Sequence, residues 1–177
     1  LGVSYSNSYG KWQRIWSFLN YLIKALFFLV KNPSDLNYII RVPLTNGVIG
    51  LVGKWFKQTP YVFEVGDLWP DIPIEMEVIK SRLVKAALFH LEKSIYLSSE
   101  KIVSLSPPMK EIIEKKVGRK KEVICIPNFS DCTFFTPSKL PQDFNTNTPF
   151  IISYIGTLGI ANGLESALQL ARGFSDE

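Results

Sequence analysis

YVFEVGDLWPD, at Tyr61–Asp71, is the segment that decides the fold predicted for this chain. Its first half, Tyr61–Val65, is a run of β-branched and aromatic residues typical of a buried strand. The run breaks at Gly66 and then presents the carboxylate of Asp67 and the indole of Trp69. Open α/β sheets build their sites where parallel strands deliver such groups at their carboxyl ends. We therefore expect a site at the end of this strand.

The rest of the chain alternates between predicted helices and strands around this segment. Further strands are expected at 36–42, 100–105, 122–126 and 150–155, and helices at 46–57, 81–97, 107–118 and 163–173. This alternation predicts an α/β fold, a Rossmann-like parallel sheet with helices on both faces. A stretch rich in Pro, Asn and Thr predicts a linker at 138–149. It separates a first domain, 1–137, from the beginning of a second Rossmann-like domain, 150–177.

The most apolar stretch lies within residues 11–31. Its apolar part, Ile15–Val30, has 16 residues and contains Asn20 and Lys24. As a helix it is roughly 24 Å long, which is shorter than the roughly 30 Å hydrocarbon core of a bilayer. The pattern favours a buried crossover helix. A helix lying in the membrane interface, with Trp12, Trp16 and Lys24 near the headgroups, is the alternative.

Two helices have a predicted buried side. In the helix at 46–57 the apolar side carries Val48, Leu51, Val52 and Phe56. The glycines of this helix recur every three residues and permit a close approach to a sheet or a ligand, at Gly47, Gly50 and Gly53. In the helix at 81–97 the apolar side carries Val84, Leu88, Leu91 and Ile95, and the opposite, polar side carries Arg82, Lys85, Glu92 and Lys93.

Composition and charge limit the kinds of partner and site that we expect for this chain. The chain has 177 residues and a net charge of +4, a balance that suits an anionic partner such as nucleotide phosphate, lipid pyrophosphate or a membrane surface. No nucleic-acid recognition motif accompanies the charge. Cys125 and Cys132 form neither a disulfide framework nor a metal-ligand pattern. We expect no metal and no cofactor, and a reducing cytoplasmic location.

Two groups of residues are candidates for binding. Gly156, Gly159, Asn162 and Gly163 lie in a turn between a predicted strand and a predicted helix, where backbone N–H groups can hold an anion. Glycine serves any tight turn of this kind, so the pattern alone does not single out phosphate. Asp67 and Trp69 could orient and stack a sugar, with Arg41 at the end of the preceding strand nearby. Equally, Asp67 could cap the next segment and Trp69 could fill the core.

Four motifs together resemble the retaining family 4 glycosyltransferases, which have the two-domain GT-B fold. These motifs are FEVGDLWPD at 63–71, KIVSLSPPM at 101–109, EVICIPNFSD at 122–131 and YIGTLGIANGLESAL at 154–168. They occur in the order found in the family. The similarity is greatest to the bacterial branch that builds surface polysaccharides, such as lipopolysaccharide or capsule, on lipid-linked acceptors.

The resemblance implies roles for the candidate residues. Asp67, Trp69 and Arg41 would lie on the acceptor side, and Gly156, Gly159, Asn162 and Gly163 would face the donor diphosphate. Asn128 and Asp131 would form the interdomain hinge. Many members have a histidine before the motif aspartate, where this chain has Gly66, so the resemblance assigns no catalytic residue. We expect the chain to be a fragment of a longer enzyme: most of the acceptor-side N-terminal domain and the start of the donor-side C-terminal domain.

Two main functions follow as expectations, and a stand-alone nucleotide-binding α/β domain is a less favoured third, because the single glycine-rich turn lacks the rest of its sheet. The first is hexosyl transfer from a nucleotide-sugar to a lipid-linked saccharide, in the cytoplasm or peripherally on the inner face of the cytoplasmic membrane. The second is a non-catalytic, truncated α/β module that acts by membrane or protein association.

Overall fold

A computed structural model describes residues 2–4, 6, 9–40, 44–136, 151–156 and 162–173 of the chain. The chain divides into two compact units, Leu1–Ser130 and Asp131–Glu177. The predicted linker at 138–149 lies outside the described residues.

The first unit is built on a four-stranded parallel sheet with the strand order β1-β2-β3-β4. The strands are β1 (Asn37–Ile40), β2 (Tyr61–Val65), β3 (Lys101–Ser104) and β4 (Val123–Cys125). The β2 strand has the bounds that its sequence predicts, and the other three lie inside their predicted ranges. The prediction of an α/β fold with a parallel, Rossmann-like sheet is thereby confirmed.

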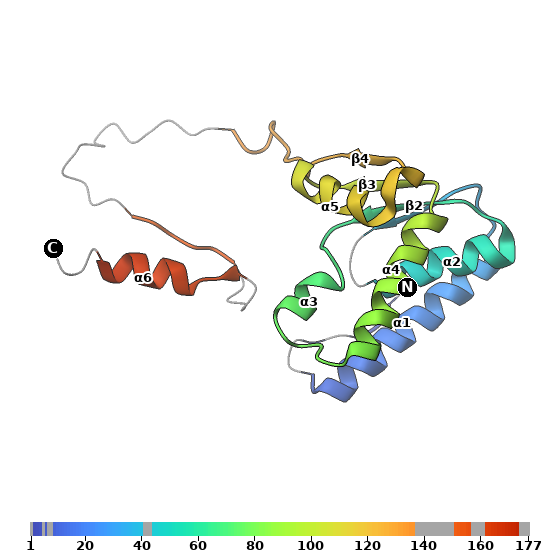
Figure 1. The fold of residues 1–177 in the computed structure, drawn as a ribbon, viewed down its shortest axis with the longest axis horizontal. Helices are drawn as coiled ribbons and strands as arrows, with labels where there is room; N and C mark the ends of the chain where they lie inside the picture. The colour runs from blue at the N-terminus through green and yellow to red at the C-terminus, as the bar shows by residue number, and fades with distance from the viewer. Residues whose placement is uncertain are drawn as a thin grey trace. The chain divides into compact units, whose positions relative to one another are not determined.

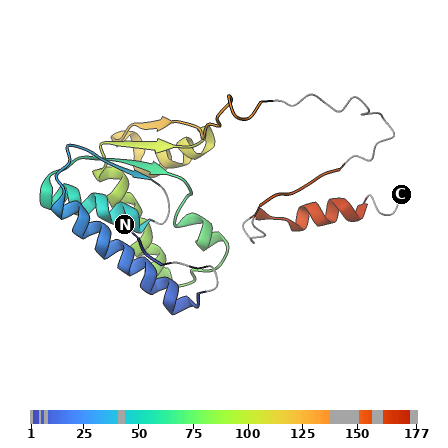
Figure 2. The ribbon, with the colours of Figure 1, turned by 180° about the vertical axis from the view of Figure 1, so that it is seen from behind.

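Four of the five α-helices that the structure describes in this unit pack against one another in sequence. The five are α1 (Lys11–Lys31), α2 (Thr45–Lys57), the short α3 (Asp71–Glu75), α4 (Arg82–Ser98) and α5 (Pro107–Val117). Helix α1 packs on α2, α2 on α4, and α4 on α5. Figures 1 and 2 show these four helices on the same side of the sheet. Right-handed crossovers between strands in sequential order place every crossover helix on the same face.

Strand register separates the face of the sheet that the helices cover from a second face on which the described residues place no helix. Ile39, Phe63, Ile102 and Val123 are partners across the four strands, and all are buried under the helices. One residue further along each strand, Ile40, Glu64, Val103 and Ile124 are partners on the opposite face. There Ile40 on the edge strand β1 is 53% exposed and Ile124 on the edge strand β4 is 36% exposed, whereas Val103 on the inner strand β3 is buried.

Parallel sheets are normally covered on both faces. Within the described residues, the helices that pack in the first unit cover only one face. Helices on the second face therefore stay a prediction.

Helix α2 approaches its neighbours through glycine. A Cβ at Gly47 would lie 2.5 Å from Ile95 on α4, and one at Gly50 would lie 2.6 Å from Ile39 and 2.8 Å from the Tyr61 ring. The predicted close approach is thus confirmed, with the sheet and α4 as the groups approached. The predicted buried side of α2 is wrong in part, because Leu51 is buried but Phe56 is 79% exposed. The glycine side, which has no side chains, comes closer to the sheet than a side with large residues could.

Helix α1 differs from the favoured prediction of a buried crossover helix. Only Ala25 and Leu29 are buried among its apolar residues, and most of the others are exposed. Helix α1 contacts the rest of the first unit along one narrow side, which packs on α2. Among the helices that the structure describes, none combines the length and apolar character needed to cross a bilayer.

The second unit contains one described helix, α6 (Glu165–Gly173), within the range predicted from sequence. The predicted strand at 150–155 is wrong for the part that the structure describes, because 151–155 form no regular structure and are exposed. A strand needs a partner for its backbone N–H and C=O groups. The described residues of this unit provide no such strand.

Candidate functional site

The candidate site lies where β2 ends. The chain leaves the sheet at Val65, turns through Gly66, Asp67 and Leu68, and enters α3 at Asp71. Because all four strands are parallel, the ends of β1, β3 and β4 lie along the same edge of the sheet. This is the edge at which open α/β sheets bind ligands.

Asp67 and Trp69 differ in their surroundings. Trp69 is partly buried and packs against the hydrophobic core, as in the alternative in which it fills the core. Asp67 is exposed and has no hydrogen bond or ion pair within the described part of the chain. A carboxylate in this position is available to accept a hydrogen bond from a ligand hydroxyl group.

A small cavity lies behind this turn. It is lined by Leu44, Phe63, Glu64, Val65, Gly66, Asp67, Trp69 and Tyr96. Its volume is about 10 Å³, which has room for about one water molecule and not for a sugar ring. A sugar would therefore bind at the surface beside Asp67 and not inside this cavity.

A partly buried ion cluster holds the residue that follows this turn, Asp71. Lys116 on α5 donates to both carboxylate oxygens of Glu92 on α4, at 2.8 and 3.0 Å, and also to Asp71 at the start of α3. The Glu92 side chain is only 2% exposed and that of Lys116 20%. The Lys116 ammonium also lies 5.4 Å from the centre of the Phe89 ring. The cluster thereby joins three helices beneath the site.

This cluster corrects the sequence analysis, which assigned Glu92 to the solvent side of its helix. The periodicity of α4 puts Glu92 beside the apolar side, and a cation from a distant helix makes its burial possible. One feature of the sequence was consistent with the burial of Glu92. Tyr96 follows Glu92 by four residues, a spacing at which two side chains are neighbours on a helix, so the Tyr96 hydroxyl group could be a partner for the carboxylate. Lys116 lies in the basic run KKVGRKK at 115–121, whose composition is typical of a solvated turn and indicates no buried partner, although the structure places Lys116 in α5.

Burial has the largest effect on the pKa values of the two buried groups, Glu92 and Tyr96. Desolvation raises the pKa of Glu92, although the hydrogen bond and charge of Lys116 act in the opposite direction. Burial likewise raises the pKa of Tyr96, and the neighbouring Glu92 charge adds to the effect. Tyr96 therefore stays neutral beside the cavity.

Arg41, the third predicted acceptor residue, lies outside the described residues, although it directly follows β1. On the open face the Tyr38 hydroxyl group donates to Glu64 Oε2 at 2.8 Å. Burial and Glu64 together raise the pKa of Tyr38.

The predicted donor residues belong to the second unit. Gly163 precedes α6 with a φ of +59°, which favours glycine, and its carbonyl oxygen accepts from the Ser166 N–H at 3.1 Å. Gly156 is exposed in a bend, and Asn162 is exposed in a helical turn. Gly159 lies outside the described residues. The structure thus describes the turn into the helix, but only part of the predicted phosphate loop.

The predicted hinge residues flank the boundary between the units. Asp131 begins the second unit, and its carboxylate accepts from the Thr133 N–H at 2.9 Å, the Thr133 hydroxyl group at 2.5 Å and the Phe134 N–H at 3.2 Å. These hydrogen bonds lower the pKa of Asp131. Asn128 is exposed near the end of the first unit. Asp131 therefore organises a local turn where the chain passes from one unit to the other.

The described residues contain no group of three His, Cys, Asp or Glu side chains that could hold a metal ion. The chain matches no model of a known protein family, and no curated protein matches it.

Proposed function

We propose that this chain is part of a retaining glycosyltransferase that moves a sugar from a nucleotide-sugar to a lipid-linked saccharide. The observation that carries the proposal is the position of Asp67, which is exposed at the carboxyl end of β2 in a parallel sheet. The motif resemblance assigns the acceptor to this position. The mildly basic chain also suits the anionic donor and acceptor.

The chemistry divides between the two units. In the first, Asp67 accepts a hydrogen bond from an acceptor hydroxyl group, and Trp69 limits how deeply the saccharide can bind. In the second, the Gly156–Gly163 turn faces the donor diphosphate. As the C1–O bond to the diphosphate breaks, backbone N–H groups and the α6 N-terminus stabilise the leaving charge. The acceptor oxygen then bonds to C1 on the face that the diphosphate leaves, and the proton of the acceptor hydroxyl group passes to the departing diphosphate oxygen. Attack from that face retains the anomeric configuration.

Transfer of radiolabelled sugar tests the proposal. The intact protein carrying this chain is incubated with a panel of labelled nucleotide-sugars and a lipid extract containing polyprenyl-diphosphate saccharides. We expect label in the lipid fraction with one donor. Asp67→Asn should lower transfer about tenfold, because the acceptor hydroxyl group then donates to a neutral amide oxygen in place of a charged carboxylate, and should leave the affinity for the donor unchanged.

Gly159→Val is the complementary variant. It should weaken binding of the same nucleotide-sugar in calorimetry. The proposal fails if no donor binds, or if both variants transfer sugar at the parent rate.

A non-catalytic role in membrane association is the second candidate function. The observation that favours it is the exposed apolar side of α1.

A further inference from the structure

Helix α1 carries a continuous apolar stripe on its outer side. Its members follow one another at intervals of four and three residues, which places them on one face of a helix. All are large, and all are exposed: Trp12 83%, Trp16 70%, Leu19 45%, Ile23 63%, Phe27 61% and Val30 54%. We call these six residues the α1 stripe. Contiguous exposed apolar surface of this kind marks an interaction site.

The opposite side of α1 holds the helix to the body. Ala25 and Leu29 are each only 8% exposed, and α1 packs on α2. The ammonium group of Lys57, at the end of α2, donates to the carbonyl oxygens of Leu29 and Val30. Because this side is fixed, the α1 stripe faces away from the folded unit.

The charge of α1 has one sign. The helix contains Lys11, Arg14, Lys24 and Lys31 and no acidic residue. Gln13, Asn20, Lys24 and Lys31 lie next to the stripe along one flank of the helix at 100° per residue. Lys31 also lies 4.4 Å from the centre of the Phe27 ring, at the end of the stripe. An apolar stripe with a basic and amide rim is complementary to an anionic bilayer surface.

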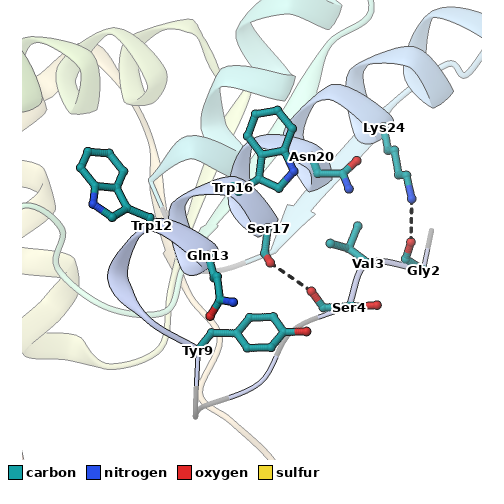
Figure 3. Close-up of a pocket in the computed structure, with 10 residues that line it drawn as sticks. All are labelled: Gly2, Val3, Ser4, Tyr9, Trp12, Gln13, Trp16, Ser17, Asn20 and Lys24. Carbon is teal, nitrogen blue, oxygen red and sulfur yellow. Dashed lines mark hydrogen bonds between the residues drawn. The ribbon is translucent and has the colours of Figure 1, made fainter.

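A polar groove runs beside the amino-terminal half of the stripe (Figure 3). It has a volume of about 570 Å³ and is lined by residues that include Trp12, Trp16, Asn20 and Lys24. Ser17 donates to the Ser4 carbonyl oxygen at 3.0 Å, and Lys24 donates to that of Gly2 at 3.0 Å. Tryptophan beside polar and cationic groups is the combination enriched at the level of lipid headgroups.

We propose that the α1 stripe docks on an anionic lipid bilayer, with α1 lying parallel to the surface and its stripe inserted among the headgroups and upper acyl chains. The all-basic charge and the two tryptophans favour a lipid surface over a second copy of the chain, since two copies would bring like charges together. The proposal names the lipid partner of the second candidate function, membrane association, and rests on it. It does not depend on the sugar transfer proposed above, because it is argued from α1.

Vesicle sedimentation tests the docking. The full chain is mixed with vesicles of 70% phosphatidylcholine and 30% phosphatidylglycerol, or of phosphatidylcholine alone. We expect binding to the anionic vesicles that is at least several-fold tighter than to the neutral ones and falls with added salt. Tryptophan fluorescence should shift to the blue and be quenched by brominated acyl chains.

Matched variants locate the surface. Ile23→Ser with Phe27→Ser should weaken vesicle binding at least tenfold, because two large side chains no longer leave water. Phe129→Ser removes an equally large side chain that is 93% exposed outside α1, and should bind as the parent does. Since the changed residues are exposed, circular dichroism should show an unchanged fold. Lys24→Gln with Lys31→Gln should reduce mainly the preference for anionic vesicles.

Three outcomes would overturn the proposal. One is equal sedimentation of the double serine variant and the parent. Another is equal binding to anionic and neutral vesicles. The third is a parent chain that is dimeric in gel filtration and becomes monomeric in the double serine variant without lipid binding, which would make the stripe an interface between copies.

Discussion

The Lys116 ammonium group on α5 lies 2.8 Å from Glu92 Oε1 on α4, and this pair connects the two helices beneath the candidate site. The Glu92 side chain is almost fully buried, so its charge depends on Lys116 for compensation. Removing one partner of a buried pair leaves an uncompensated charge, which costs much more than an exposed pair contributes. The stability of the first unit should therefore be sensitive to this one lysine.

Lys116→Met should lower the free energy of unfolding by about 3–5 kcal/mol at pH 7. The penalty should shrink as the pH falls, because Glu92 can then accept a proton and become neutral. The direction of this pH dependence follows from the raised pKa of Glu92 in the folded state. Because the folded state binds the proton more tightly than the unfolded state, protonation of Glu92 stabilises the fold. This stabilisation is present below the ordinary pKa of Glu92 and is lost as the pH rises through the raised pKa. Urea denaturation between pH 4 and 8 measures the difference from the parent chain. A penalty independent of pH would contradict the assignment.

Gly50→Ala should destabilise the first unit, although alanine is the better helix former. The new Cβ would lie 2.6 Å from Ile39 and 2.8 Å from the Tyr61 ring, and overpacking of this kind costs about 1–3 kcal/mol. Gly53→Ala is the matched control in the same helix. Its Cβ would lie 3.2 Å from the flexible end of Leu29, so the helix propensity of alanine should offset much of the strain. Equal melting temperatures for the two variants would show that α2 does not pack closely through Gly50.

Two neighbouring residues of β1 should respond differently to truncation. Ile39 is 8% exposed on the covered face of the sheet, whereas Ile40 is 53% exposed on the other face. Ile39→Ala should cost about 2–5 kcal/mol, and Ile40→Ala less than about 1 kcal/mol. Chemical denaturation of both variants measures the ratio. A large cost at Ile40 would mean that another surface covers the second face.

Tyr61→Phe should cost about 0.5–1.5 kcal/mol, because the buried Tyr61 hydroxyl group donates to the Ile95 carbonyl oxygen at 2.6 Å. Burial also raises the pKa of Tyr61 above its ordinary value of 10.0. This group therefore contributes stability that is present below pH 10 and is lost as the pH rises further. The variant should lose less stability than the parent between pH 9 and 11. Parallel losses in the two chains would argue against the buried hydroxyl group.

The strands were predictable because their signal is local. The run Tyr61–Val65 alternates buried and half-buried residues, and its β-branched and aromatic composition marks it without knowledge of its neighbours. The cap of α5 was equally local: Ser106 accepts from the Met109 N–H at 3.3 Å, directly before Pro107. The predicted strand is thereby confirmed with its bounds.

What depends on distant residues was not predictable. The burial of Glu92 requires Lys116, which is separated from it by 24 positions in the chain. Phe56 is exposed because the glycine side of α2, and not the side with the large apolar residues, lies closest to the sheet. The candidate site shows the same division. The position of Asp67 could be predicted from the strand that precedes it. The small cavity behind Asp67 could not, because it is lined in part by Tyr96 on α4.

The sequential strand order has a consequence for how the first unit folds. Each of the four strands that the structure describes pairs only with strands next to it along the chain, so each ladder closes a loop no longer than one β-α-β unit. Loop closure costs less when few residues intervene, and local topologies fold faster than those with distant pairings. Folding can then grow one strand at a time from either end. Removing a terminal strand would shorten the sheet by one ladder and leave the remaining ladders intact.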